Sequence, residues 1–247
     1  MTRLSVNINK VAVLRNTRSL GIPSVIWAAQ TAIEAGAYGI TVHPRPDERH
    51  IRYTDVYELK EIVRNVEFNI EGNPFEGRYM QLMPDVRPTQ ATLVPDSINA
   101  VTSNQGWDLQ NKENQRKLIP IIKELHDLGI RASIFVEPVW QVVEIAKEIG
   151  ADRVELYTEH FASAFARKEG LQQQIEQYSA AGKKAVDLGL GLNAGHDLSL
   201  ENLGFFCKNV KSVDEVSIGH ALVADALKMG LQNAVKEYLK ILAHTGD

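Results

Sequence analysis

The sequence contains one cysteine, no long apolar run and no strongly basic segment. Cys207 cannot form an internal disulfide, so nothing calls for an oxidising compartment. No run of about 18 apolar residues is present, which argues against a spanning helix, and the first residues lack the apolar core of a signal peptide. The net charge of −4 without clustered Lys and Arg argues against general nucleic-acid or membrane-surface binding. We therefore expect a cytoplasmic, soluble protein.

The length and composition are those of an ordinary globular protein. The chain has 247 residues, of which 44% are hydrophobic and 23% charged. This length fits either two small domains or one α/β barrel. Because no linker or low-complexity segment divides the chain, we predict one domain over residues 1–247.

Eight short segments with strand character recur along the chain, and each precedes a predicted helix. Several are nearly continuous apolar runs, such as GITV at 39–42, as buried parallel strands usually are. Eight such units predict an α/β fold, a single (β/α)8 TIM barrel with parallel strands. A doubly wound open sheet is the alternative, but it usually has a glycine fingerprint after the first strand, and NINK has none. The strands are predicted to begin near residues 4, 39, 67, 91, 131, 153, 189 and 215.

Local signals predict where several helices begin and end. Ser24 and Thr54 are predicted N-caps, and Gly129 is predicted to follow the end of a helix. One helix is expected over residues 76–83 and another, continuous, over residues 221–242. The glycine-rich segment at 189–192 is predicted as the seventh strand, leading into Asn193, Gly195, His196 and Asp197.

Polar and titratable side chains are predicted at the carboxyl ends of the strands, where barrel enzymes place their active sites. Several such residues at equivalent points indicate one shared site. They are Asn7, Asn9, Lys10, His43, Arg45, Glu71, Asp96, Glu137, Glu155, Thr158, His196, Gly219 and His220.

Three of these residues suit proton transfer. His43 and His196 can titrate near neutral pH. Glu71 should point into the barrel mouth, where burial would raise its pKa and make it a usable base. The alternative for Glu71 is a salt bridge to Arg45 or Lys10.

Cationic side chains on the same rim indicate anion binding. Arg15, Arg18, Arg45, Arg49 and His50 lie in two predicted loops, and Arg suits bidentate phosphate contacts. The last helix, which opens at Gly219 and His220, offers free N–H groups to an anion. Two such clusters predict two phosphorylated substrates or one bisphosphate. The alternative is that the arginines pair with Asp47, Glu48 and Asp55.

Other chemistry has little support in the sequence. No His-x-His at the first strand and no HExxH motif occur, which disfavours a hydrolytic metal site, and no P-loop or Gly-x-Ser-x-Gly elbow is present. Lys10 could form a Schiff base with a carbonyl, as an aldolase lysine does, or it could pair with a substrate phosphate. The loops at Arg45–Arg52 and Ser97–Trp107 are predicted lids.

Motifs along essentially the whole chain resemble the pyridoxine 5′-phosphate synthase family. The resemblance rests on VNINKVAVLRNTR, GITVHPRPDERHI, FNIEGN, TLVPD, VTSNQGWDL, VELYT, LNAGHDL and IGHALV. It implies a cytoplasmic (β/α)8 barrel, a homo-octamer, that acts without metal or organic cofactor. The implied reaction is of the transferase type. It joins 3-amino-2-oxopropyl phosphate to 1-deoxy-D-xylulose 5-phosphate, closes the pyridine ring, and releases inorganic phosphate and water in vitamin B6 biosynthesis.

The resemblance also implies residue roles. His43 and Glu71 match two proton acceptors and His196 matches the proton donor. Positions around the amino-ketone phosphate are matched by Asn7, Arg18, Asp197, Gly219 and His220. Positions around the deoxyxylulose phosphate are matched by Asn9, Lys10, Arg45, His50 and Thr102. The chain departs from the common family pattern at Asn9-Lys10, where many members have Asp-His, at Asp197, where many have Gly, and at Tyr157, where His is common.

Two other functions remain open from the residues alone. One is an aldolase or epimerase acting on sugar phosphates, for which Lys10 would be the Schiff-base residue. The other is a non-catalytic barrel that binds phosphosugars.

Overall fold

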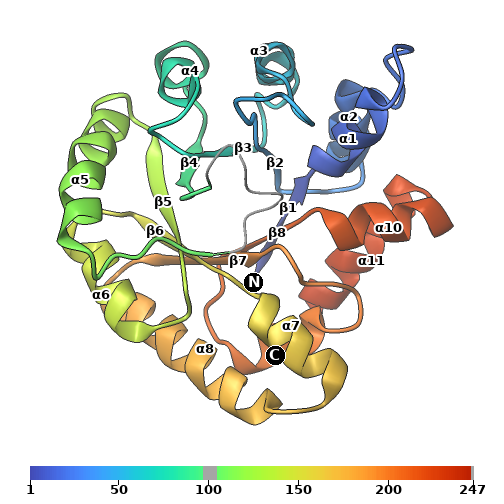
Figure 1. Ribbon diagram of the computed structural model, residues 1–247. Coiled ribbons are helices and arrows are strands. Elements are labelled where there is room, and N and C mark those ends of the chain that lie inside the picture. The colour runs from blue at the N-terminus through green and yellow to red at the C-terminus, as the bar shows by residue number, and fades with distance from the viewer. Residues whose placement is uncertain (97–104, 246–247) are drawn as a thin grey trace.

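The computed structural model describes residues 1–96 and 105–245 and confirms the predicted barrel. Eight parallel strands close in chain order, with β8 pairing with β1 (Figure 1). Each strand is followed by helical structure that packs outside the barrel. The strands are Arg3–Asn7 (β1), Gly39–Val42 (β2), Glu67–Gly72 (β3), Gln90–Leu93 (β4), Arg131–Val136 (β5), Arg153–Leu156 (β6), Gly191–Gly195 (β7) and Glu215–Ile218 (β8).

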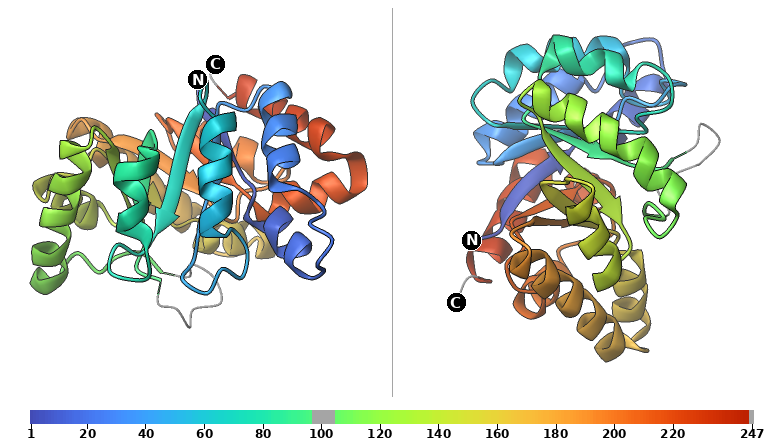
Figure 2. Two further views of the ribbon diagram at one scale, coloured as in Figure 1. Left: turned by 90° about the horizontal axis from the view of Figure 1, so that it is seen from above. Right: turned by 90° about the vertical axis from the view of Figure 1, so that its left-hand side faces the viewer.

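The helices form a layer around the strands (Figure 2). No helix in the described ranges is both long and apolar enough to cross a bilayer. The helices are Asn9–Asn16 (α1), Val25–Glu34 (α2), Tyr53–Ile62 (α3), Tyr79–Val86 (α4), Lys112–Asp127 (α5), Trp140–Glu148 (α6), Glu159–Arg167 (α7), Leu171–Asp187 (α8), Leu203–Asn209 (α9), His220–Met229 (α10) and Leu231–Ala243 (α11).

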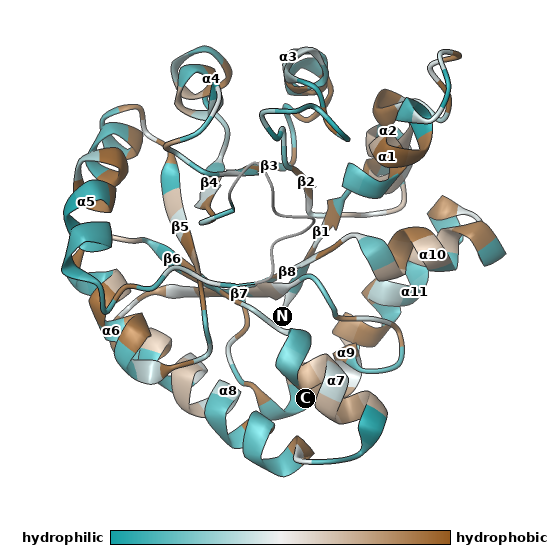
Figure 3. Ribbon diagram, viewed as in Figure 1, coloured by the Kyte–Doolittle hydropathy of each residue, from teal (hydrophilic) through white to brown (hydrophobic). Residues whose placement is uncertain are grey.

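The main hydrophobic core lies between the barrel and its helices. Alternate strand residues such as Leu4, Val6, Ile40 and Val42 are completely buried there, because successive side chains of a strand point to opposite faces. In Figure 3 the outer sides of α5 and α8, which face away from this core, are mostly hydrophilic. This packing fixes the strands and therefore the positions of the residues at their ends.

The inside of the barrel is polar, where branched apolar side chains are usual. Ser5 and Thr41 share a hydrogen bond of 2.7 Å between their hydroxyls, Asn69 Nδ2 donates to Thr41 Oγ1 at 3.3 Å, and the Thr92 hydroxyl donates to Asn69 Oδ1 at 2.9 Å. All four side chains are fully buried. Such a network is stable only where its polar groups have partners, and it fixes their orientation.

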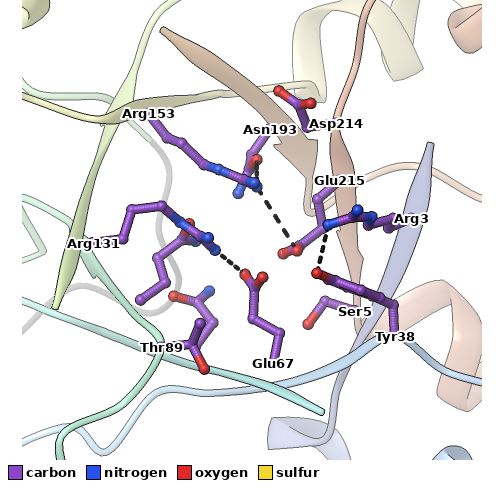
Figure 4. A network of polar contacts seen from close by, with 12 residues as sticks. Arg3, Ser5, Tyr38, Glu67, Thr89, Arg131, Arg153, Asn193, Asp214 and Glu215 are labelled. Atoms are coloured by element: carbon purple, nitrogen blue, oxygen red, sulfur yellow. Dashed lines mark hydrogen bonds and ion pairs between the residues drawn. The ribbon is translucent and has the colours of Figure 1, made fainter. Parts of the chain in front are cut away.

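An ionic network closes the end of the barrel at the start of the strands (Figure 4). Arg131 Nη2 forms a short ion pair with the buried Glu67, and Arg131 Nε donates to Gln90 at 2.9 Å. Arg153 Nη1 donates to Asn193 Oδ1 at 2.8 Å and lies 3.9 Å from Glu215. Burial and the neighbouring Glu67 hold the pKa of Glu215 well above its usual range. This end of the barrel is therefore filled by polar and ionisable side chains that contact one another.

Several predicted boundaries are confirmed. Ser24 caps α2 by accepting the Trp27 N–H at 3.3 Å, and Gly129 follows α5 with a φ of +74°. The first residues of the strands agree with the predictions within two positions. The largest difference is β7, which begins at Gly191 because Gly189 is still in the turn after α8, with a φ of +68°.

Other predictions for the helices were wrong. α1 follows β1 directly and was not predicted. α4 begins three residues later than expected, and the predicted final helix is two helices separated at Gly230 with a φ of +83°. Thr54 does not cap α3, because the Asp55 carboxylate accepts the Arg52 N–H at 2.7 Å. α7, which lies between β6 and α8, was not predicted either.

The ionic network predicts a large effect of removing one partner. Arg131→Ala leaves the carboxylate of Glu67 buried without its cation, so we expect the free energy of unfolding to fall by about 3 kcal/mol. Urea denaturation measures this loss. Lys123→Ala is the control, because Lys123 pairs with Asp127 at an exposed position and should change stability by less than about 1 kcal/mol. Equal effects of the two substitutions would contradict the role given to the network.

Candidate active site

Most of the predicted site residues line one cavity of about 410 Å³ at the carboxyl ends of the strands. Among the residues that were given a catalytic or binding role, the exceptions are Arg18, which is exposed and does not line the cavity, and Thr102, which lies outside the described residues. The other predicted strand-end residues, Asp96, Glu137, Glu155 and Thr158, do not line it. The lining comprises Asn7, Asn9, Lys10, His43, Arg45, His50, Glu71, Tyr157, Glu159, His196, Asp197, Ser217, Gly219 and His220. Side chains from widely separated segments thus meet at one mouth.

Glu71 lies at the centre of this mouth and is almost completely buried. Its Oε2 atom lies 3.9 Å from His43 Nδ1 and accepts a hydrogen bond of 3.4 Å from Asn7 Nδ2. Burial, together with the nearby charge of Glu155, raises the pKa of Glu71 to about 8. The expected rise in pKa is therefore present, and no salt bridge to Arg45 or Lys10 holds Glu71 among the described residues.

His196 follows β7 and has the opposite electrostatic environment from His43. Its Nδ1 atom lies 3.5 Å from Oε1 of Glu155, which is fully buried. Burial alone would lower the pKa of His196, but the attraction of Glu155, Glu71 and Asp197 outweighs burial and raises it to about 9. The imidazole is therefore protonated at neutral pH.

The backbone at His196 is held in an unusual conformation. Its φ of +57° lies in the left-handed region, which costs a residue with a side chain on the order of 1 kcal/mol or more. The preceding Gly195 must be glycine, because a Cβ atom there would lie 2.4 Å from the carbonyl oxygen of Ser217. Phe135 packs against the His196 ring with centroids 5.0 Å apart. These contacts aim the imidazole into the cavity.

His43 and His50 lie beside cationic groups. Burial is the main reason that the pKa of His43 is well below its usual value, and His50 and Arg45 lower it further. Burial and the charges of Arg45 and Lys10 lower the pKa of His50 to about 4. Both rings are therefore neutral at pH 7. Charges that disfavour a cation favour an anion, so this side of the cavity suits phosphate.

Another part of the cavity lies at the start of α10, which follows β8. The first backbone N–H groups after Gly219 form the N-terminus of α10, and a helix N-terminus favours an anion. Asp197 lies nearby, and burial raises the pKa of its carboxyl group. The N–H of Asp197 donates to the Gly195 carbonyl oxygen at 2.8 Å, so it is already engaged within the chain.

The arginines of the predicted cationic clusters have different surroundings. Arg15 forms a buried bidentate pair with Asp55 at 2.6 and 2.8 Å, so the alternative of an internal ion pair holds for this residue. Arg49 pairs with Asp47 at the surface. Arg45 lines the cavity and its Nη1 lies 3.0 Å from Asp96. Only part of the predicted cluster therefore faces the site.

The predicted lid at Arg45–Arg52 is anchored by α1. Asn16 Nδ2 donates to the His50 carbonyl oxygen at 2.8 Å, and Arg15 Nη2 donates to the same atom at 3.1 Å. Most of the second predicted lid lies outside the described residues. In the part of the chain that the structure describes, residues 1–96 and 105–245, no group of three or more His, Cys, Asp or Glu side chains could hold a metal ion.

Comparisons with known sequences identify the family of this chain. The family model described as "Pyridoxal phosphate biosynthesis protein PdxJ" matches residues 4–244. The chain belongs to this PdxJ family. It is 52% identical over 242 residues to the pyridoxine 5′-phosphate synthase of Christiangramia forsetii, covering 98% of this chain and 100% of the relative. It is 53% identical to that of Cytophaga hutchinsonii, covering 98% and 99%.

Solved structures with low sequence identity share the fold of this PdxJ family member. The tryptophan synthase alpha chain from Legionella pneumophila aligns with a TM-score of 0.66 at 10% identity, covering 100% of this chain and 93% of that chain. Thiamine phosphate pyrophosphorylase from Pyrococcus furiosus aligns with a TM-score of 0.62 at 14% identity, covering 99% and 97%. These likenesses support the barrel architecture alone.

Three residues line the cavity in this PdxJ family member but were not predicted for the site: Tyr157, Glu159 and Ser217. Glu155 was predicted as one of the strand-end residues of a shared site, but without a partner or role, and the structure places it against His196. The alternation of Arg153, Glu155 and Tyr157 on one face of β6 was the signal that could have placed it inside the barrel.

The proximity of Glu155 and His196 predicts a change in titration. Glu155→Gln removes the carboxylate beside His196. We therefore expect the pKa of His196 to fall from about 9 by on the order of one pH unit or more. Titration of the His196 ring by NMR measures this. Glu137→Gln is the control, since Glu137 lies 3.5 Å from the exposed His160. An unchanged His196 titration in Glu155→Gln would contradict the assigned interaction.

Proposed function

We propose that this chain is a pyridoxine 5′-phosphate synthase. It would join 3-amino-2-oxopropyl phosphate to 1-deoxy-D-xylulose 5-phosphate, close the pyridine ring, and release inorganic phosphate and water. The proposal is supported most directly by one observation: His43, Glu71 and His196 share a cavity with cationic groups on one side and a helix N-terminus on the other. Relatives of about 50% identity carry the same enzyme name.

The proposed proton transfers follow from the different environments of the three residues. His196 is the proton donor, because its carboxylate neighbours keep it protonated. His43 is a proton acceptor, because it is neutral at pH 7. Glu71, with a pKa of about 8, accepts a proton only in its ionised form. Amine addition, dehydration and ring closure each move a proton at a defined place, and a shielded cavity with separate donors and acceptors suits them.

The two sides of the cavity are assigned to the two phosphates. Asn9, Lys10, Arg45, His50 and Thr102 are proposed to hold the deoxyxylulose phosphate. Asn7, Arg18, Asp197, Gly219 and His220 are proposed to surround the amino-ketone phosphate. Ionised Asp197 would repel a phosphate, and its raised pKa reduces that repulsion. Arg18 lies outside the cavity of this chain, so its part in binding is the least supported.

Three further features belong to the proposal. The reaction as written uses no metal or organic cofactor. The chain is proposed to act in the cytoplasm and to assemble as a homo-octamer, by resemblance to the family.

Purified protein supplied with both substrates should form pyridoxine 5′-phosphate, seen by its absorbance, and release phosphate. His43→Ala and His196→Ala should each lower kcat by about 100-fold or more, while calorimetry shows that substrates still bind. The Cytophaga hutchinsonii relative is the control for the assay. Absence of product when that relative is active would contradict the proposal. Borohydride trapping of a ketose phosphate on Lys10 would instead favour an aldolase.

The pKa values predict a narrow pH optimum. The logarithm of kcat/KM should rise as pH increases through about 8, where Glu71 ionises, and fall above about 9, where His196 loses its proton. This profile reports groups of the free enzyme. Glu71→Gln should abolish the rising limb along with most of the activity. A flat profile between pH 7 and 10 would contradict the assigned roles.

A further inference from the structure

The first strand ends at Asn7 and α1 begins at Asn9. The side chains of these two asparagines are hydrogen-bonded to the ends of the neighbouring strands. Asn9 Oδ1 accepts the backbone N–H of His43 at 2.9 Å. Asn7 Oδ1 accepts the backbone N–H of Asn9 at 3.0 Å, and Asn7 Nδ2 donates to Glu71 Oε2 at 3.4 Å. The ends of β1, β2 and β3 are therefore connected by one chain of amide hydrogen bonds.

The orientation of both amides is fixed by their partners. A backbone N–H can only donate, so the atoms that face His43 and Asn9 must be the side-chain oxygens. The NH₂ group of Asn7 is thereby directed at Glu71. Asn7 is itself confined, because Gly219 packs so closely that a Cβ atom there would lie 3.0 Å from Asn7 Oδ1. Few other arrangements of these side chains are available.

We propose that Asn7 and Asn9 are positioning residues, which hold Glu71 and His43 in register for proton transfer. This role is additional to the phosphate contacts assigned above and rests on the proposed function. Asn9 fixes the backbone from which His43 projects. Asn7 donates to Oε2 of Glu71 at 3.4 Å and thereby fixes the orientation of the carboxyl group. Oε1 is buried and has no hydrogen-bond partner among the described residues.

Three substitutions at these two positions separate the roles of the individual side-chain atoms. Asn9→Asp keeps the oxygen that accepts the His43 N–H, whereas Asn9→Ala removes it. Asn7→Asp keeps the oxygen bonded to Asn9 but replaces the donor beside Glu71 with a second acceptor. Asn111→Ala is a matched control, because Asn111 Oδ1 accepts the Glu113 N–H at 2.9 Å at the start of α5, away from the cavity lining.

Hydrogen exchange of the His43 backbone amide tests Asn9 without any substrate. Asn9→Ala should speed exchange by roughly tenfold, the equivalent of one hydrogen bond. Asn9→Asp should retain the protection, and Asn111→Ala should leave it unchanged. With both substrates, Asn9→Ala should lower kcat more than it raises KM. Unchanged exchange in Asn9→Ala would overturn the role of Asn9.

Titration of the labelled Glu71 carboxyl, assigned by its loss in Glu71→Gln, tests Asn7. Asn7→Asp places an acceptor where a donor stood, so Glu71 should titrate at higher pH and the rising limb of kcat/KM should move with it. An unshifted titration would overturn the role of Asn7, and circular dichroism verifies that each variant is folded. Because exchange and titration need no turnover, they decide this proposal even if the wild-type chain makes no pyridoxine 5′-phosphate.

Discussion

The interaction of one imidazole with two buried acidic side chains governs the chemistry of this barrel. Glu155 and Glu71 lie inside the mouth, where burial makes an isolated negative charge expensive. His196 relieves that cost by remaining protonated, and its pKa of about 9 follows from their attraction. The same burial keeps Glu71 largely protonated and His43 neutral. One constraint thus produces three different proton states within a single cavity.

This arrangement requires a barrel whose interior tolerates polar groups. The hydroxyl and amide network of Ser5, Thr41, Asn69 and Thr92 lies beneath the site, and the arginine and glutamate network closes the other end (Figure 4). The hydrophobic contribution to folding comes instead from the apolar side chains buried between the strands and the helices. The outer faces of the strands therefore carry the hydrophobic core, and their inner faces carry the polar side chains on which the site rests.

The sequence predicted the parts of the molecule that depend on local patterns. Apolar strands and their spacing predicted the barrel, and polar strand ends predicted His43, Glu71 and His196 as neighbours. It did not reveal that Glu155 faces His196, because that contact joins β6 to the residue after β7. It left open whether Arg15 binds an anion or pairs with Asp55, and the structure shows the pair with Asp55. The break at Gly230 was missed because one apolar stripe continues across both helices.

The most direct test is the proton state of the three residues in the unliganded protein. NMR of ring-labelled histidine and carboxyl-labelled glutamate, assigned with single substitutions, reports each group at pH 7.5. We predict that His196 is protonated, His43 is neutral and Glu71 is mostly protonated, with His196 and Glu71 titrating near 9 and 8. Two histidines that both titrate near 6.5, beside a Glu71 ionised at pH 6, would contradict the account.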